Sequence, residues 1–415
     1  MERSDGSLAS LRRLNRQRVI DALRTHGSIS RAEIARRTGL SRSTVSSLVA
    51  DLQADGLLAE RAEPGGAHGD ERSGDERSAR GRSGRPPILL SFEASAGVAL
   101  GIGFDHDHVR VAVADLSSAI LAERAVLIDT DHEAREGLDV ALAMVEEALA
   151  EAGVDRSRVI GAGLGLPGPV DQIDGVIGSS AILPGWVGVA AEEELRLRLD
   201  VPVTVDNDAN LGALGELAYG AGRGATDMVY IKITSGIGAG LILDGRLYRG
   251  WGGMAGELGH VLVASEGEVC RCGNRGCLET AASTTALLDL LRRSHGDISV
   301  AEMVELAHAG DLRCRRVIAD AGRVVGVAAA GLLNVLNPQM IVIGGDLAPA
   351  GDLLLDEVRE ALRRTALPTA ADQATVVAGE LGERAEVLGA LAGIVGASAQ
   401  TNTFHTPTHP GGGIA

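Results

Sequence analysis

Apolar residues recur every three or four positions near the start of the chain, which is the spacing of a helix with one buried face. This spacing predicts three short helices, and Gly27, Gly39 and Gly56 mark where they end. A capping box, SRAE, begins at Ser30 and opens the second helix, and Ser41 is expected to cap the third. The positions predicted to face the core are Leu11, Leu14, Val19, Ile20, Leu23, Ile34, Ala35, Val45, Leu48, Val49 and Leu52.

The third predicted helix has a polar face beside its buried one. Two short helices joined by a glycine turn are typical of a helix-turn-helix, whose second helix lies in the major groove of DNA. Arg42 and Ser43 could reach base edges, and the polar residues that follow could contact bases or phosphates. A three-helix bundle with a solvated polar face is the alternative. The predicted DNA-binding residues are Ser41, Arg42, Ser43, Thr44, Ser46, Ser47 and Arg85.

Two short segments after these helices, LLAER (57–61) and PPILLSF (86–92), predict strands that would form the wing of a winged helix-turn-helix. Between them, residues 62–85 are polar and glycine-rich and contain the tandem repeat GDERS-GDERS. Such a composition cannot build a core, so a disordered loop is predicted. Three arginines near the end of the loop could reach the DNA backbone or a minor groove, or could belong to a solvated linker: Arg80, Arg82 and Arg85.

From residue 96 onward the pattern changes to apolar strands that alternate with helices and end in polar, glycine-rich turns. This pattern is typical of an α/β fold, in which ligands bind at the ends of the strands. The last residues, 401–415, are predicted to form a disordered tail. A helix is predicted over 138–152, and strands at 97–104, 109–116, 159–168, 201–210, 227–243 and 337–348.

Composition places these elements in a class of protein. The chain has 415 residues, of which 45% are hydrophobic and only 2% aromatic, so two or three domains with aliphatic cores are expected. It has no uninterrupted apolar run of membrane-spanning length, and its N-terminus lacks the apolar stretch of a signal peptide. A soluble cytoplasmic protein with no membrane partner is therefore predicted.

The net charge of −17 is unevenly distributed. The first 50 residues carry ten arginines against four acidic residues, a surplus of six positive charges, so the remainder of the chain is at −23. A basic head on an acidic body predicts a polyanionic partner for the head alone. Lysine occurs once, as Lys232, and this bias toward arginine indicates no mechanism.

Three of the four cysteines, Cys270, Cys272 and Cys277, lie within the segment EVCRCGNRGCLE. In a reducing compartment such a cluster indicates a metal site more often than a disulfide. Three thiolates leave a tetrahedral zinc site one ligand short, and His260 is the nearest candidate for the fourth. Free thiols in a loop are the alternative. The isolated Cys314 is assigned no role.

Six segments, the cysteine segment among them, occur together in the body. In this order and spacing they resemble the ROK family of bacterial sugar kinases and sugar-responsive repressors, over roughly residues 96–398. The resemblance implies an actin-like fold of two ribonuclease-H-like lobes around a sugar cleft, and the winged head resembles the repressor branch. The segments are LGLPGPVD (164–171), LPGW (183–186), VDNDAN (205–210), ELGH (257–260), CRCGNRGCLE (270–279) and NPQMIVIGG (337–345).

The resemblance also implies site residues. One structural Zn²⁺ per chain would be held by a Cys3His set with no open position, namely His260, Cys270, Cys272 and Cys277. A sugar would be bound by Asn207, Asp208, Glu257, His260 and Glu279. Without the family, the segment DNDAN could be a strand-end turn, because Asn and Asp favour turns.

The predicted fold class is therefore α/β, an actin-like (ribonuclease-H-like) two-lobed sugar-kinase fold preceded by an all-α winged helix-turn-helix domain. The DNA-binding domain is placed at residues 1–92 and the sugar-binding domain at 93–400. The lobes of the latter are expected at about 93–215 and 216–400.

A kinase of this family would use Asp208 as the base that accepts a proton from the sugar hydroxyl. The second phosphate loop, TSGIGAG (234–240), and the late IGG turn (343–345) match the family, but the first phosphate loop does not. Gly103 stands where the acidic residue is expected, and DHDH (105–108) replaces the glycine turn. Its aspartates would face the phosphates, and like charges about 4 Å apart repel by roughly 1 to 4 kcal/mol. A solvated turn is favoured over a metal site for DHDH.

The function predicted from these features is transcriptional regulation, most simply repression, by a homodimer or higher oligomer on a double-stranded DNA operator. A sugar in the zinc-braced cleft would modulate DNA binding, and no catalytic residues are assigned. One alternative is an ATP-dependent ROK sugar kinase with an appended DNA-binding domain. Another is a DNA-binding protein whose sugar site is vestigial.

Overall fold

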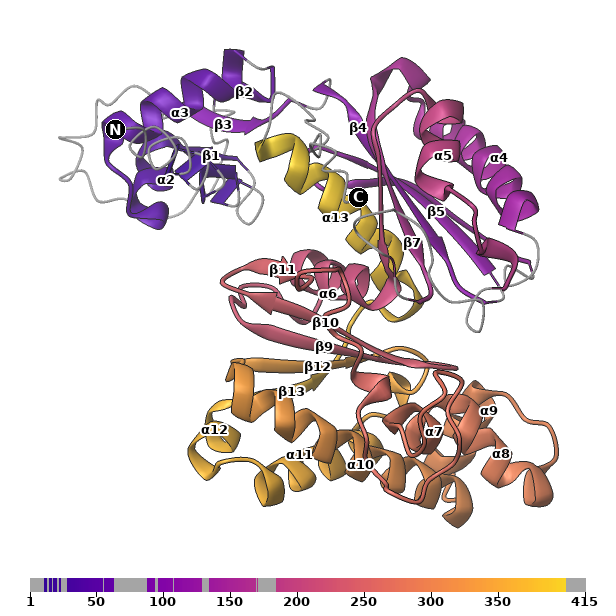
Figure 1. Cartoon of the computed structure of the whole chain (residues 1–415). Helices are drawn as coiled ribbons and strands as arrows, with labels where there is room; N and C mark the ends of the chain where they lie inside the picture. Colours follow the sequence, from indigo (N-terminus) through magenta and orange to yellow (C-terminus); the bar gives the residue numbers. More distant parts are fainter. Residues whose placement is uncertain are drawn as a thin grey trace, which may run out of the picture. The chain divides into compact units, whose positions relative to one another are not determined.

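The computed structural model describes most of the chain (Figure 1). The loop was expected at 62–85, and its residues 63–85 lie outside the described residues, whereas Ala62 ends a strand. The expected tail at 401–415, residues 86–87 of the predicted second wing strand, Leu14, Arg85 and Asp107 also lie outside them. The chain divides into two compact units, and the second of them comprises Ala99–Val113 and Ile120–Ile394. The described residues are 11–12, 15–16, 18–20, 22–23, 28–54, 56–62, 88–93, 96–106, 108–128, 134–168, 170 and 184–400.

The head contains the predicted helix-turn-helix. Ser30 caps the second helix by accepting a hydrogen bond from the backbone N–H of Glu33 at 3.2 Å. Gly39 ends that helix in the left-handed conformation, at φ 69°, and Ser41 Oγ accepts from the N–H of Thr44 at 3.1 Å. The elements are α2 (Arg31–Thr38), α3 (Arg42–Ala54), β1 (Ile29–Ser30), β2 (Leu58–Ala62) and β3 (Ile88–Phe92).

The head also holds an antiparallel sheet in the order β1-β3-β2, so it contains one strand that the sequence pattern did not predict. This strand is only two residues long and overlaps the capping box, so it has no periodicity of its own. The predicted core positions Ile34, Val45 and Leu52 are buried. The prediction that Leu11 faces the core is wrong, because 53% of this residue is exposed.

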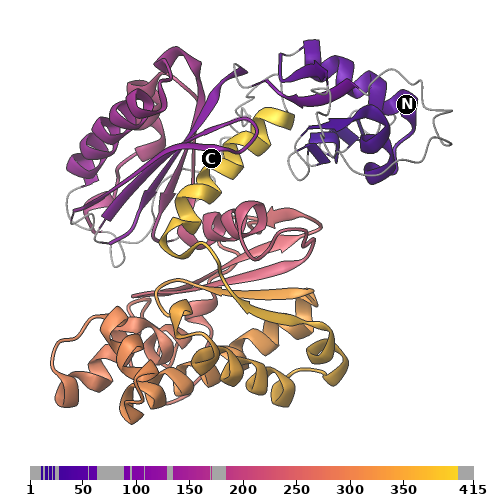
Figure 2. The same ribbon diagram turned by 180° about the vertical axis from the view of Figure 1, so that it is seen from behind.

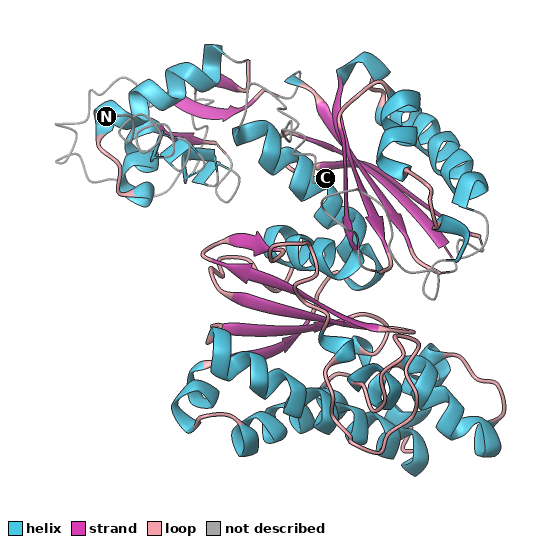
Figure 3. Cartoon of the chain, in the orientation of Figure 1, coloured by secondary structure: helices cyan, strands magenta, loops and turns pink. Residues whose placement is uncertain are grey.

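The body contains two five-stranded sheets. Figure 3 draws their strands in magenta. Their orders are β6-β5-β4-β7-β8 and β11-β10-β9-β12-β13. Counted from the first strand of each sheet, both orders read 3-2-1-4-5, so the same topology occurs twice and confirms the expected two-lobed α/β fold. The strands are β4 (Val98–Phe104), β5 (His108–Asp115), β6 (Ile120–Leu127), β7 (Val159–Leu166), β8 (Val203–Asn207), β9 (Met228–Ile233), β10 (Ile237–Leu243), β11 (Arg246–Tyr248), β12 (Met340–Gly344) and β13 (Thr375–Ala378).

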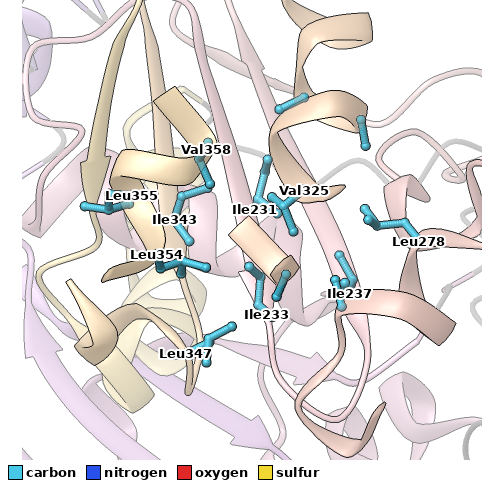
Figure 4. Packing of buried hydrophobic residues seen from close by; sticks show 14 of the residues in the cluster. Ile231, Ile233, Ile237, Leu278, Val325, Ile343, Leu347, Leu354, Leu355 and Val358 are labelled. Carbon is cyan, nitrogen blue, oxygen red and sulfur yellow. The ribbon is translucent and has the colours of Figure 1, made fainter. Parts of the chain in front are cut away.

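The helices of the body cover these sheets (Figures 1 and 2). In the second lobe they bury an aliphatic core that includes Ile231, Ile343, Val325 and Leu354 (Figure 4). Helix α10 is the one helix in the described part of the chain that is long and apolar enough to cross a membrane, and half of its apolar stretch is buried in this core. The helices are α4 (Ala134–Ala152), α5 (Ala191–Leu199), α6 (Asp208–Tyr219), α7 (Leu278–Ala282), α8 (Thr284–His295), α9 (Val300–His308), α10 (Leu312–Leu336), α11 (Asp352–Thr365), α12 (Pro368–Gln373) and α13 (Ala385–Gln400).

Two helices each pack on the sheet of the other lobe, not on the sheet whose last strand precedes them in the chain. Helix α6 follows the last strand of the first sheet but packs on β9 and β10 of the second. Helix α13 follows the last strand of the second sheet but packs on the first, where a Cβ added to Gly163 of β7 would lie 2.6 Å from Ala390 O. The two helices touch through their backbones, since a Cβ on Gly389 would lie 1.7 Å from Leu211 O. This crossing brings the first turns of α6 and α13 to one place.

Candidate functional site

A buried cluster of charged side chains lies where the two lobes meet. Lys232, from β9, donates a hydrogen bond from Nζ to Asp208 Oδ2 at 2.7 Å. The same Nζ lies 3.7 Å from Asp105, which follows β4, and 3.7 Å from Glu386 in the first turn of α13. The chain's only lysine is therefore surrounded by three carboxyl groups from three other elements.

Burial and charge shift the pKa values in this cluster. Burial alone would raise the pKa of Asp105, but the positive charge of Lys232, helped by the His106 N–H, lowers it to about 2. Burial raises the pKa of Glu386 well above its usual value, against the effect of Lys232, and nearby Asp208 and Asp105 raise it further. The three carboxylates raise the pKa of Lys232 despite its burial, so it stays an ammonium. Lys232 is thus a buried cation at neutral pH, held among three carboxyl groups.

A solvated turn was expected at residues 105–108, and for Asp105 this expectation is wrong. Its side chain is 23% exposed and is directed at Lys232. A cavity of about 20 Å³ lies among Asp105, Asp208, Lys232 and Glu386, with Gly345 and Gly382 on its wall. That volume holds roughly one water molecule.

The four predicted zinc ligands lie together in the structure. His260 Nδ1 lies 3.6 Å from Cys270 Sγ, and Cys272 Sγ lies 3.7 Å from Cys277 Sγ. A tetrahedral zinc with ordinary bond lengths would separate sulfur from nitrogen by about 3.6 Å and sulfur from sulfur by about 3.8 Å. The residues therefore fit the metal in both donor type and spacing, and all four ligand atoms lie within 4.8 Å of one another.

The cysteine loop folds back on itself at Gly276. This residue has φ 73°, and a Cβ there would lie 1.6 Å from Ala264 O, so only glycine fits. Burial raises the pKa of Cys277 to about 12, whereas the N–H of Asn274 lowers the pKa of Cys272. Without metal, Cys277 is a thiol at neutral pH, and zinc would displace its proton on binding.

His260 connects this loop to the predicted sugar-binding carboxylates. Its Nδ1 faces Cys270, and its Nε2 lies 3.8 Å from Glu257. Burial raises the pKa of Glu257, and the charges of Asp208 and Glu279 add to the effect while His260 opposes it. Three predicted sugar-binding side chains, Glu257, His260 and Glu279, therefore lie near one another and near Asp208.

Glu279 is held by partners that the sequence did not reveal. Arg271, between two of the cysteines, donates to it from Nε at 2.8 Å and from Nη2 at 3.0 Å. The backbone N–H of Ile237, in the predicted second phosphate loop, donates to its Oε2 at 3.3 Å. Asn207, the remaining predicted sugar-binding residue, caps α6 with Oδ1 and donates from Nδ2 to Gly168 O at 2.8 Å.

Sequence reasoning also missed Lys232 and Glu386. The one available signal was that Lys232 is the only lysine and sits on a strand of buried apolar residues. Lysine is almost never fully buried unless it is paired, so this position called for carboxylate partners. Glu386 had no comparable signal, because it becomes part of the cluster only through the helix crossing.

The predicted recognition helix presents its polar side chains to solvent. Arg42, Ser43, Ser46 and Ser47 are exposed, and Thr44 is half-buried. Ser41 is exposed too, and its hydroxyl lies 2.8 Å from both Ser43 Oγ and Thr44 Oγ1. Arg85 lies outside the described residues.

The duplicated sheet, the acidic residue at the start of α6 and the Cys3His loop define the class: a winged-helix protein with a two-lobed body of the sugar-kinase type. The family model "ROK family" matches residues 98–395, and the model "MarR family" matches 16–67. The chain belongs to the ROK family.

Relatives divide according to whether they match the head. The xylose repressor of Caldicellulosiruptor bescii is 27% identical over 94% of this chain and 97% of its own length. A crystal structure of a ROK family transcriptional regulator, a homologue of the E. coli MLC protein, covers 94% of this chain and 97% of its own, with TM-score 0.75 and 26% identity. The glucokinase of Halalkalibacterium halodurans is 38% identical but covers 56% of this chain and 76% of its own. Proteins that match both head and body thus include repressors, and the glucokinase match is confined to about half the chain.

Proposed function

We propose that the protein is a transcriptional repressor whose binding to an operator is modulated by a sugar or sugar derivative held in a zinc-braced site of its body. Residues 1–92 would bind DNA as part of a homodimer or higher oligomer, and residues 93–400 would bind the sugar. One observation carries the choice of regulator over enzyme: Lys232 forms a 2.7 Å ion pair with Asp208, the residue that a kinase would use as its base.

The ion pair opposes phosphoryl transfer in two ways. Both oxygens of Asp208 already accept hydrogen bonds, Oδ2 from the Lys232 ammonium and Oδ1 from the N–H of Ala209, so the carboxylate is a weaker base for a hydroxyl proton. Lys232 also draws Asp105 of the degenerate first phosphate loop toward the same point, leaving about 20 Å³ of open volume. A terminal phosphate with its metal ion needs far more room than one water molecule occupies. These contacts support a body that binds without catalysing.

The sugar-binding role would fall to carboxylates that the zinc loop holds in place. Zinc at the Cys3His set would fix His260 and the cysteine loop, and through them Glu257 and Glu279. Carboxylates held in this way can accept hydrogen bonds from sugar hydroxyls with little loss of side-chain entropy. The sugar must bind one state of the protein better than the other, because only a difference in affinity can shift operator binding.

Measuring operator affinity with and without sugar tests this function. A thermal-shift screen would first identify sugars and sugar phosphates that bind, and an operator selected from random duplexes would serve as the DNA probe. We expect a binding sugar to change operator affinity at least about tenfold, which is roughly 1.4 kcal/mol of coupling. If every sugar that binds leaves operator affinity unchanged, the proposed regulation is wrong. ATP-dependent phosphorylation of a hexose, abolished by Asp208→Asn, would instead favour the kinase.

Replacing Arg42 by alanine is expected to weaken binding to the selected operator by about 5- to 150-fold, because a base contact of this kind is worth roughly 1–3 kcal/mol. Sugar binding should be unaffected, and fluorescence anisotropy with labelled duplex would measure the change. Arg316→Ala removes the same charge from an exposed position in the body, where 72% of the side chain is accessible. This control should retain operator affinity. Equal affinities for the wild-type and Arg42→Ala proteins would show that α3 is misassigned as the reading helix.

A further inference from the structure

A second group of metal-ligating side chains lies between α8 and α10, outside the Cys3His loop. His295 is the last residue of α8, Asp311 caps the start of α10, and Cys314 lies in its first turn. Their ligand atoms all lie within 4.8 Å of one another. Imidazole, carboxylate and thiolate are three donors that zinc accepts, and here the fold brings them together from two helices.

The distances within this trio are those of ligands around a small ion. His295 Nε2 lies 3.3 Å from Asp311 Oδ2 and 3.9 Å from Cys314 Sγ. A tetrahedral zinc would separate nitrogen from oxygen by about 3.4 Å and nitrogen from sulfur by about 3.6 Å. The first distance matches, and the second requires a shift of only a few tenths of an ångström.

Neighbouring groups already orient two of the three ligands. Asp311 Oδ1 accepts the backbone N–H groups of Arg313 and Cys314, both at 2.9 Å, so its Oδ2 is the oxygen directed at His295. Ser294 Oγ lies 2.8 Å from His295 Nδ1, which leaves Nε2 to face the other two ligands. Partners of this kind are typical of metal sites, where they set the orientation of the imidazole ring.

Burial and access also suit a metal ion. Cys314 is fully buried in the core of the second lobe, whereas the side chains of His295 and Asp311 are 13% and 33% exposed. Solvent therefore reaches the carboxylate and the imidazole, while the thiol lies in the core. A bound ion would be accessible to a water molecule beside Asp311.

We propose that His295, Asp311 and Cys314 form a second zinc site, with a water molecule completing a tetrahedral set. The ion would join the end of α8 to the start of α10. This site is independent of the proposed regulatory function, since it shares no residue with the sugar site or with the Cys3His loop. The competing account is a purely hydrogen-bonded cap on α10, in which the same three side chains contact one another directly.

Zinc content of the full-length protein distinguishes the two accounts. After equilibration with Zn²⁺ and removal of loosely bound ion, we expect two zinc ions per chain in the wild-type protein by mass spectrometry. Cys314→Ser and His295→Ala should each hold one. His308→Ala, a control at an exposed histidine of α9, should retain both. Wild-type protein and Cys314→Ser that hold equal zinc would overturn the inference.

Cobalt substitution provides a second measurement that needs no comparison of total metal. With Co²⁺ in both sites, four thiolates would contribute to the thiolate-to-cobalt absorption, three from the loop and one from Cys314. Cys314→Ser should lose about a quarter of that absorption. Should this variant fail to fold, His295→Ala serves instead, because it should remove cobalt from the trio alone. An unchanged spectrum in a folded variant would leave the cap on α10 as the correct account.

Discussion

Replacing Lys232 by methionine is expected to destabilise the body by about 3–5 kcal/mol at pH 7, because breaking a buried ion pair leaves uncompensated charge. Methionine has a similar length but no charge, so packing changes little. Asp105 and Asp208 would remain in the interior without their shared cation. Thermal unfolding measures the effect, and a loss of this size corresponds to roughly 5–8 °C in Tm for a body of about 300 residues.

Substitutions of both partners distinguish the contribution of the ion pair to stability from the effect of lost packing. Asp208→Asn combined with Lys232→Met removes both charges of the 2.7 Å pair, so the double variant should be less destabilised than the sum of the two single variants. Lys232→Arg, which keeps the charge, should lose less stability than Lys232→Met. An unchanged Tm in Lys232→Met would mean that the cluster does not stabilise the protein.

The same cluster predicts a dependence on pH. The pKa of Asp105 is lowered from 3.8 to about 2 in the folded protein, so its contribution is fully present above pH 3.8 and is lost as the pH falls through 2. Lys232 is the largest cause of this lowering, so most of the contribution is lost without it. The difference in stability between wild-type protein and Lys232→Met should therefore narrow between about pH 4 and pH 2.

The features that the sequence predicted well are local. Ser30 and Ser41 cap helices within three residues of themselves, and strands such as β4, β7 and β12 each carry their own apolar run. The Cys3His set also spans one short stretch of chain, from His260 to Cys277, whose donor types are characteristic of zinc. Local spacing is sufficient in these cases because the interacting groups are neighbours in the chain.

The features that were missed depend on long-range packing. The sequence around Lys232 does not show that α6 and α13 each pack on the sheet of the other lobe. This packing places Asp208 and Glu386 beside Lys232. The role of Arg271 was hidden for a different reason, since an arginine between two cysteines has many possible partners. In the folded chain the partner of Arg271 is Glu279. The family resemblance had given Glu279 a role in sugar binding only, but this ion pair also holds its carboxylate in place.

Replacing Cys272 by serine is expected to abolish zinc binding at the Cys3His set, because serine is a poor substitute for the thiolate that completes its four protein ligands. The cysteine loop would then lose the constraint that fixes His260, and through it Glu257. We expect sugar affinity to fall at least about tenfold, roughly 1.4 kcal/mol. Zinc content and the sugar-induced shift in Tm measure the two effects.

The head should respond differently, since it shares no residue with the zinc loop. Cys272→Ser is therefore expected to bind the selected operator normally but to lose the response to sugar. Arg275→Ala is the matched control, because Arg275 lies in the same loop and donates to Gly267 O without contributing a ligand. This variant should retain both zinc and the sugar response. If Cys272→Ser loses its zinc but still responds fully to sugar, the metal does not brace the sugar site, and the carboxylates must be held by Arg271 and the backbone alone.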